Sequence, residues 1–446
     1  MSFPRYPKYK ASGVEWLGDV PEGWVLQRLK HSSRIPIKNG LGESADSDDP
    51  NQPRYVRITD IKSPRELHES TFKSLPMETA ELARFHVGDI LFACVGATFG
   101  KSYLHSIDAG PMCFAGYLAR YSPKPSVDSR FISYWTESRT FWDQLQANVI
   151  QSTIQNFSAA KYRELVLVVP AAADQTAIAE FLDRETGKID GLVGEQRRLM
   201  ELLKEKRQAV ISHAVTKGLN PHAPMKPSGI EWLGEVPEHW EVMSLRRCKK
   251  RIQTGGTPPT ADQSYYEDGT VPWFGPGSFD ENLTVSEPIK WLNESAVKEG
   301  VARVFAAGAT MIVTIGATLG KVSSLVEDGS CNQQITVIEF DPRRVCARFA
   351  TYQIKRLEPA LRAIAPSATL PILGLGEVAD IDMVIPPLVD QVAIVAHLDA
   401  ELAKFDTLTA EAQRAIDLLQ ERRTALISAA VTGQIDVRQQ NGRYLV

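Results

Sequence analysis

The chain contains the same segment twice. Residues 10–24 read KASGVEWLGDVPEGW and residues 226–240 read KPSGIEWLGEVPEHW, so that eleven of fifteen positions are identical at an offset of 216. The offset returns downstream, where Asp174-Gln175 becomes Asp390-Gln391 and ISHAVT at 211–216 becomes ISAAVT at 427–432. A solenoid repeat is only about 20–50 residues long. The repeat therefore predicts two domain-sized copies of one fold, which would hold two similar surfaces in a fixed mutual geometry.

Composition excludes several classes of protein. At 446 residues the chain is long enough for about three domains, and its 43% hydrophobic and 23% charged residues are ordinary for a globular protein. No apolar run approaches the roughly 18 residues that cross a bilayer, and the first ten residues lack the apolar centre of a secretory signal. None of the five cysteines forms a C-x-x-C pair, so neither a zinc site nor a disulfide framework is indicated. We expect a cytoplasmic protein with no membrane partner.

Each half divides into a repeated segment, a variable body and a long stretch rich in alanine, leucine and charge. We expect five regions: a first body with its repeat segment over 1–173, a long helix over 174–217, a second body with its repeat segment over 218–389, a second long helix over 390–433 and a tail over 434–446. Asp174 and Asp390 are predicted N-caps, and Gly218 and Gly433 are predicted C-terminal stops.

The two long stretches have the spacing of a coiled coil. Ten positions in each, starting at Ile178 and Ile394, step alternately by four and three residues, and most of them are apolar. This spacing over four heptads is typical of a coiled-coil seam. A helix that lies only on its own body is the alternative, but such a helix would be about 48 Å long, which is longer than a body of this size requires.

Four charged seam positions predict how the helices pair. Glu185 and Glu401 lie early in their helices, whereas Lys206 and Arg422 lie late. If the helices are antiparallel and paired residue numbers sum to about 607, Glu185 meets Arg422 and Glu401 meets Lys206. Half-buried charges of this kind can fix the register of a coiled coil.

The variable bodies are predicted to be α+β. Short helical patterns lie near 131–147 and 347–364. Strand-like runs, separated by turn clusters, are Tyr55–Ile58, Ile90–Val95, Leu165–Val169, Thr310–Ile315, Ile335–Phe340 and Met383–Ile385.

Two G-A-T-x-G-K strings resemble phosphate loops at first sight. The Walker A pattern requires four residues between its glycine and the Gly-Lys pair, but here there are three, and Val322 replaces the residue that would hold magnesium. We interpret each string as a strand end and a tight turn that presents Thr98 and Lys101 in one body and Thr318 and Lys321 in the other. These side chains suit phosphate or base contacts, although a purely structural turn is the alternative.

No catalytic centre is readable. The chain has no dinucleotide fingerprint, no amino-methylation motif and no H-E-x-x-H string. We therefore expect that it binds no metal and no cofactor of its own.

Polar strings in the bodies are suited to reading bases instead, because glutamine and asparagine bond adenine and hydroxyls contact several bases. The net charge of −4 argues against indiscriminate binding through phosphates alone, although five cations lie within 246–251. Beside the turn residues above, the predicted DNA-contact residues are Gln151, Ser152, Thr153, Gln155, Asn156, Arg251, Thr257, Asn332, Gln333, Gln334, Ser367 and Thr369.

The arrangement resembles the specificity subunit of type I restriction–modification enzymes over nearly the whole chain. The resemblance is carried by the W-L-G-x-V-P-x-x-W segments, the string RIQTGGTPP at 251–259, the G-A-T-x-G-K turns, the polar string near 151–157 and the helix starts VVPAAADQ and IPPLVDQ. The first body departs from this pattern, since it carries Asn39-Gly40-Leu41-Gly42 in place of G-G-T-P-P.

The resemblance implies two target recognition domains in a pseudo-twofold repeat, joined by an antiparallel coiled coil. Each domain would read one half of a split, asymmetric site in double-stranded DNA, and the coiled coil would set the gap. The subunit itself would be a non-catalytic prokaryotic protein. It would recruit two copies of a methylation subunit that uses S-adenosylmethionine, and restriction subunits that use ATP and Mg²⁺.

Three other functions are open on the sequence. The chain could be a self-contained enzyme, against which the missing motifs argue. It could be a coiled-coil scaffold that binds only proteins, or the specificity component of another two-part restriction or phage-defence system.

Overall fold

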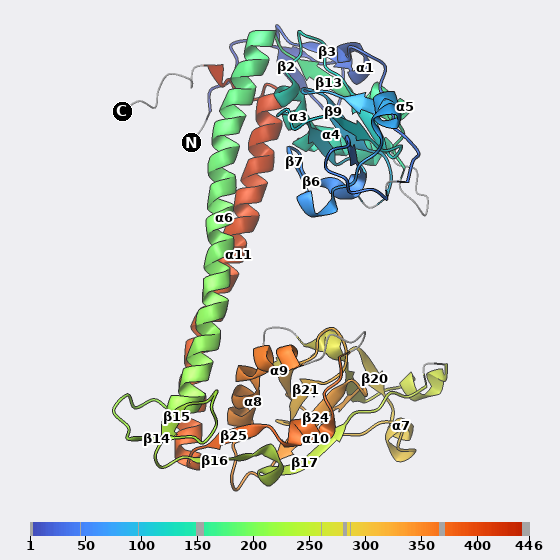
Figure 1. Cartoon of the computed structure of the whole chain (residues 1–446). Coiled ribbons are helices and arrows are strands. Elements are labelled where there is room, and N and C mark those ends of the chain that lie inside the picture. The colour runs from blue at the N-terminus through green and yellow to red at the C-terminus, as the bar shows by residue number, and fades with distance from the viewer. Residues whose placement is uncertain are drawn as a thin grey trace. The chain divides into compact units, whose positions relative to one another are not determined.

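The computed structural model describes residues 3–44, 46–96, 98–148, 156–259, 261–279, 283–285, 287–364 and 371–438 (Figure 1). The chain packs as two compact units. Unit 1 combines the residues up to Arg197 with those from Gln413 onward, and unit 2 is the continuous segment Arg198–Ala412. No helix among the described residues is long and apolar enough to cross a membrane.

Unit 1 contains a body built on a four-stranded antiparallel sheet in the order β10-β9-β12-β4. The central strand β9 is buried along its whole length, and Phe92 in it stacks on Tyr162 with ring centroids 4.8 Å apart. The strands of unit 1 are β1 Tyr9–Ala11, β2 Asp19–Pro21, β3 Val25–Arg28, β4 Lys38–Asn39, β5 Arg54–Val56, β6 Ile61–Ser63, β7 Glu66–Leu67, β8 Arg84–Phe85, β9 Ile90–Ala93, β10 Ser102–Leu104, β11 Met112–Phe114, β12 Leu118–Tyr121 and β13 Val166–Val169. Its short helices are α1 Leu29–Ser32, α2 Met77–Ala80, α3 Ser129–Glu137, α4 Arg139–Asn148 and α5 Ala159–Glu164.

Unit 2 contains a second body with a five-stranded sheet in the order β17-β24-β21-β22-β19. Its strands are β14 Met225–Pro227, β15 Glu235–Pro237, β16 Glu241–Ser244, β17 Lys249–Thr254, β18 Val271–Phe274, β19 Thr284–Val285, β20 Lys290–Leu292, β21 Thr310–Val313, β22 Val322–Leu325, β23 Ser330–Cys331, β24 Ile335–Phe340 and β25 Asp382–Ile385. Its short helices are α7 Glu294–Lys298, α8 Ala347–Arg356, α9 Glu358–Ile364 and α10 Leu375–Ala379.

The two bodies share the core of their topology, although the large sheet of unit 2 has β19 as an additional strand. In unit 1 the first strand of the body, β3, pairs with the last, β13, and in unit 2 β16 pairs with β25 in the same way. The run β9 to β12 corresponds to β21 to β24, with a helix (α3 or α8) directly after it. The α+β prediction for both bodies is confirmed.

The two long helices are α6, Ala172–Lys217, and α11, Leu388–Val431. Both begin two residues before the predicted starts, so Asp174 and Asp390 lie in the first turn and are not N-caps. Helix α11 starts directly behind the proline at 387, and α6 starts two residues behind the proline at 170, because a proline restricts the residue before it and not those that follow.

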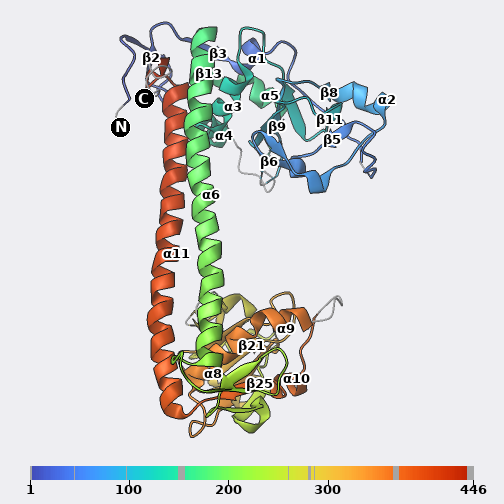
Figure 2. The same ribbon diagram turned by 60° about the vertical axis from the view of Figure 1, so that its left-hand side comes forward.

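Within each unit, α6 and α11 lie side by side and run antiparallel (Figure 2). Ion pairs fix the direction. Arg423 bonds Asp190 in unit 1, and Arg207 bonds Asp406 in unit 2. The residue numbers of both pairs sum to 613. The two pairs are related by the repeat, because Asp406 lies 216 positions after Asp190 and Arg423 lies 216 positions after Arg207.

The ion pairs that form differ from the predicted ones. Glu185 pairs with Lys188 and Glu401 pairs with Lys404, each on its own helix, while Lys206 and Arg422 are exposed. Beside the hydrogen bond from Lys404, the positive charge of Lys206 still helps to lower the pKa of Glu401, so the meeting of the two helices near this pair stays a prediction. Every second seam position lies one residue later than predicted. The seam uses Thr186, Val193, Met200 and Arg207 on α6, and Leu402, Thr409, Ile416 and Arg423 on α11.

The repeated N-terminal segments close the ends of these helices. Trp24 and Trp240 are the buried second tryptophans of the two segments. Trp240 packs on Gly218 behind α6, and Trp24 packs on Gly433 behind α11. Both glycines have a positive φ, 77° and 74°, that side chains rarely adopt. The near identity of the segments follows from this shared contact, and both predicted stops are confirmed.

Candidate nucleic-acid interface

In unit 2, the end of β17 and the loop between β23 and β24 are held together by glycines. The Gly256 amide donates to the Cys331 carbonyl at 2.8 Å, and the Gly255 amide donates to the Ile335 carbonyl at 3.0 Å. A Cβ atom on Gly255 would lie 2.1 Å from the Cys331 oxygen, so only glycine permits this approach. As a result, the Thr257 hydroxyl donates to the amide oxygen of Gln333.

The G-A-T-L-G-K turn lies between that loop and a third segment. The Thr314 amide donates to the Gln334 carbonyl at 2.8 Å, and the Gly316 amide donates to the Pro371 carbonyl at 3.0 Å. Gly316 and Gly320 have φ of 100° and 88° and give the turn its shape. Five predicted residues, Thr257, Thr318, Asn332, Gln333 and Gln334, therefore belong to one cluster of loops, and Gln333 is exposed.

Two predicted contact residues of unit 2 are bound within the protein instead. The Lys321 ammonium donates to the Phe279 carbonyl at 2.8 Å. Arg251 donates to the Gln253 amide oxygen at 2.6 Å and lies over the Phe305 ring at 4.8 Å. Both would have to leave these partners to reach DNA, so their role in contacting DNA stays a prediction.

Unit 1 builds the same cluster with different side chains. The Cys94 amide donates to the Tyr117 carbonyl at 2.9 Å, as Thr314 does to Gln334, and the Phe157 amide donates to the Cys94 carbonyl at 2.7 Å. Asn156 is thereby held opposite Val95, next to the turn that carries Thr98 and the exposed Lys101. Four predicted residues of the first string, Gln151, Ser152, Thr153 and Gln155, lie outside the described residues, as do Ser367 and Thr369 in unit 2.

Tyr117 is a candidate contact residue that the sequence did not indicate. It occupies the position of Gln334 between two core strands and is 66% exposed. Asn39 lies beside it, and its amide donates to the Gly116 carbonyl at 2.9 Å. The sequence signal for Tyr117 was weak. The repeat offset of 216 does not hold inside the bodies, so it does not align Tyr117 with Gln334, and a single tyrosine forms no recognisable motif.

The clusters can hydrogen-bond and stack, but their thiols are inert. Burial raises the pKa of Cys94 to about 11, partly opposed by the hydrogen bond from Asn39, and burial raises the pKa of Cys331 to about 12. Both thiols are therefore protonated near neutral pH and are not nucleophiles. Among the described residues no group of three or more metal-binding side chains gathers. Amides, hydroxyls and one aromatic ring are the groups that read base edges and stack on bases.

Comparison with known proteins identifies the family. The model of the type I restriction modification DNA specificity domain matches residues 21–193 and again residues 237–417. The chain belongs to this family. The two matched ranges coincide with the two bodies and their helix starts, so each body is one specificity domain.

Relatives extend the likeness over the whole chain. The MjaX specificity subunit of Methanocaldococcus jannaschii, named for a type I restriction enzyme, is 22% identical over 95% of this chain and 96% of its own length. The StySPI specificity subunit of Salmonella potsdam is 20% identical over 72% of this chain and 69% of its own. A solved structure from a study of type I R-M complex assembly has the same fold, with a TM-score of 0.66, 18% identity and coverage of 93% of this chain and 99% of that one.

Proposed function

We propose that this specificity-domain chain reads a bipartite, asymmetric DNA site, one half-site per body, and that the α6–α11 pair sets the gap between them. It is the non-catalytic specificity subunit of a type I restriction–modification complex. It recruits two copies of a methylation subunit, which supplies S-adenosylmethionine chemistry, and restriction subunits that use ATP and Mg²⁺.

One observation carries the proposal. The same loop cluster occurs in both bodies with the same backbone hydrogen bonds, but with different side chains. Thr257, Gln333 and Gln334 line it in unit 2, and Asn39, Tyr117 and Asn156 line it in unit 1. Two loop clusters with the same backbone hydrogen bonds but different side chains suit two half-sites of different sequence, because hydrogen-bonding side chains distinguish the bases.

The repeated segments support two equivalent partners. Trp16 is 46% exposed and its repeat equivalent Trp232 is 57% exposed, on the hairpins that close the ends of the long helices. Exposed tryptophans are common centres of protein interfaces. A chain that carries the same patch twice can bind the same partner twice.

The test is selection from random DNA by the full chain together with its methylation partner. We expect a split motif with a fixed gap, and exchange of residues 25–170 for another body should change one half-site only. Recovery of no motif, with the partner present, would show that the chain is a protein-binding scaffold and not a reader.

A further inference from the structure

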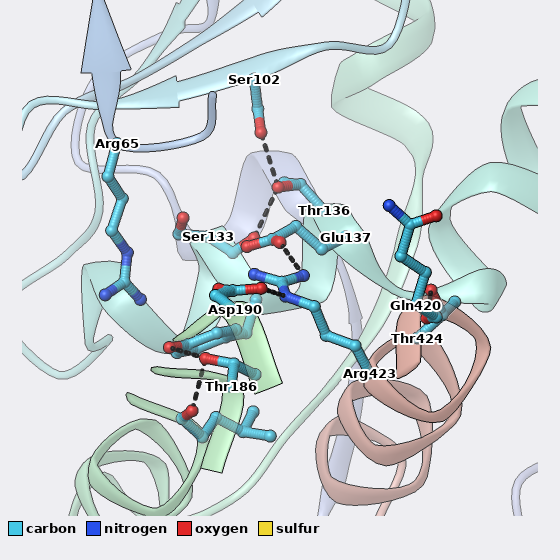
Figure 3. A network of polar contacts seen from close by, with 12 residues as sticks. Arg65, Ser102, Ser133, Thr136, Glu137, Thr186, Asp190, Gln420, Arg423 and Thr424 are labelled. Atoms are coloured by element: carbon cyan, nitrogen blue, oxygen red, sulfur yellow. Dashed lines mark hydrogen bonds and ion pairs between the residues drawn. The ribbon is translucent and has the colours of Figure 1, made fainter. Parts of the chain in front are cut away.

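Arg423 joins three elements of unit 1. Its guanidinium donates to the Glu137 carboxylate at the end of α3 at 2.6 Å, and to Asp190 of α6 at 2.9 Å (Figure 3). The side chains of Arg423 and Glu137 are both largely buried. Arg423 thus links the body to both long helices at once, beside other contacts such as the hydrogen bond from the Arg139 amide to the Ser428 hydroxyl of α11.

The repeat does not reproduce this contact in unit 2. Arg207, the repeat equivalent of Arg423, pairs with Asp406 between the helices. The bodies align through Tyr134 and Tyr352, whose hydroxyls donate to the equivalent carboxylates Asp183 and Asp399. By this alignment Lys355 occupies the place of Glu137.

Lys355 forms its own buried ion pair, with Glu358 at 2.6 Å. Lys355 of α8 is positively charged, whereas Glu137 at the same position of α3 is a carboxylate. An ammonium group has no acceptor, so Lys355 cannot accept a hydrogen bond from an arginine of a long helix. In unit 2 the body bonds the helix through other groups, such as Gln208, which donates to the Arg356 carbonyl at 3.1 Å. The contact of a helix arginine with a body carboxylate is therefore a property of unit 1, whereas the helix-to-helix contact is common to both arginines.

The charge of Glu137 depends on Arg423. Burial raises the pKa of Glu137, and the positive charge of Arg423 opposes this rise. Without the arginine a buried carboxylate would lose its main partner, which is strongly unfavourable unless the body moves and admits water. There is room for movement, since a cleft of about 960 Å³ lies beside the pair, between the β6–β7 hairpin, α3 and the long helices.

We propose that Arg423 is a positioning residue for DNA recognition: it fixes the orientation of the first body on the helix pair and thereby the gap at which that body reaches its half-site. This rests on the proposed function, in which the helix pair sets the gap. Arg207 bonds between the helices alone and is the matched control.

The first experiment measures the attachment without DNA. Spin labels at Leu82→Cys on the body and Glu195→Cys on α6, in the full chain with Cys346→Ser, report the distance between body and helix by electron paramagnetic resonance. Arg423→Met and Glu137→Gln should broaden the distance distribution, and Arg207→Met should leave it unchanged. An unchanged distribution in Arg423→Met, in a chain with wild-type circular dichroism, would overturn the proposal.

The second experiment measures the consequence for DNA. In the selection described above, performed on sites with variable gaps, Arg423→Met should accept gaps one base pair longer and shorter and should bind the wild-type site about tenfold more weakly. Both half-site sequences should stay as they are. Arg207→Met should keep the single gap.

The outcomes separate the two proposals. If Arg207→Met widens the accepted gaps as much as Arg423→Met, the effect belongs to the helix pair, and the positioning role is wrong. If the wild-type chain selects no split motif, the proposed function fails, and the label distances still decide whether Arg423 holds the body.

Discussion

At the residue scale, repeated polar side chains dock the bodies on the long helices. Asp183 accepts hydrogen bonds from Arg65 at 2.6 Å and from Tyr134 at 2.7 Å, and it pairs with Arg130. Burial alone would raise its pKa, but these hydrogen bonds and the nearby positive charges outweigh burial, so that the pKa of Asp183 lies below its usual value. The carboxylate therefore stabilises unit 1 only while it is ionised.

Replacing this carboxylate should give a pH-dependent loss of stability. We expect Asp183→Asn to lower the free energy of unfolding by about 1 kcal/mol at pH 7, a modest figure because solvent reaches the group. Since the folded pKa is lowered, the contribution is complete above the unfolded value of about 3.9 and disappears as the pH falls through the folded pKa. Urea titrations at pH 7 and below pH 4 measure it, and an equal loss at both would contradict the assignment.

The glutamine of the repeated Asp-Gln pair has a structural role that predicts a larger effect. Gln391 is fully buried, and its side chain accepts from the Cys346 amide at 2.7 Å and donates to the carbonyls of Arg344 and Pro386. Gln391→Ala should cost about 2–4 kcal/mol, because a fully buried side chain with three hydrogen bonds is lost and its backbone partners, the most buried of which is the Pro386 carbonyl, are left without it. Gln413→Ala on the same helix is the exposed control and should change stability by less than about 0.5 kcal/mol. Urea unfolding compares them.

At the scale of elements, spacing predicted which segments would be helices but not which faces would meet. Leu192 and Leu199 are apolar and fit the predicted seam, yet both are exposed, while Thr186 and Arg423 lie in it. Both choices of phase have apolar residues in most positions, so the sequence cannot separate them. The contacts that decide, such as Glu137 with Arg423, come from segments 286 residues apart in the chain.

The seam can be tested with two leucines on one helix. Leu203 is 8% exposed and Leu199 is 41% exposed. Leu203→Ala should lower the free energy of unfolding by about 2–3 kcal/mol, and Leu199→Ala should lower it by less than about 1 kcal/mol. The predicted seam contains both leucines and would make the two losses similar, so thermal or urea unfolding of the pair decides the phase.

The candidate interface was predictable in part for a related reason. The turn residues and the Asn332–Gln334 string were recognisable separately, but only strand pairing brings them together. Arg251 and Lys321 looked like free cations because their partners, Gln253 excepted, lie far away in the sequence. Tyr117 is defined as a candidate by its place in the loop, which no local pattern encodes.

At the scale of the whole molecule, the proposed function makes the length of the helix pair the determinant of the gap. Inserting seven residues after Arg197 in α6 and seven before Gln413 in α11 preserves the seam and adds about 10 Å. The selected gap should widen by up to about three base pairs, with both half-sites unchanged. The same insertion in α6 alone breaks the pairing and should abolish binding. A gap that stays constant in the double insertion would contradict the role of the helices.

Unit 1 is assembled from both ends of the chain, and this has a consequence for synthesis. Ile178, Phe181 and Leu182 pack in one cluster with Ile427 and Val437. Because ribosomes add about 5–20 residues per second, roughly 10–50 seconds pass between the synthesis of the first three side chains and that of the residues that bury them. Leu203 of unit 2 also packs with a late residue, Leu402, but unit 2 is continuous and is complete once Ala412 has been added, before the last segment of unit 1 is made. Of the two bodies, the one synthesised first is thus completed last, and loss of the segment from Ile427 to Val437 would damage the body built from the earliest part of this sequence.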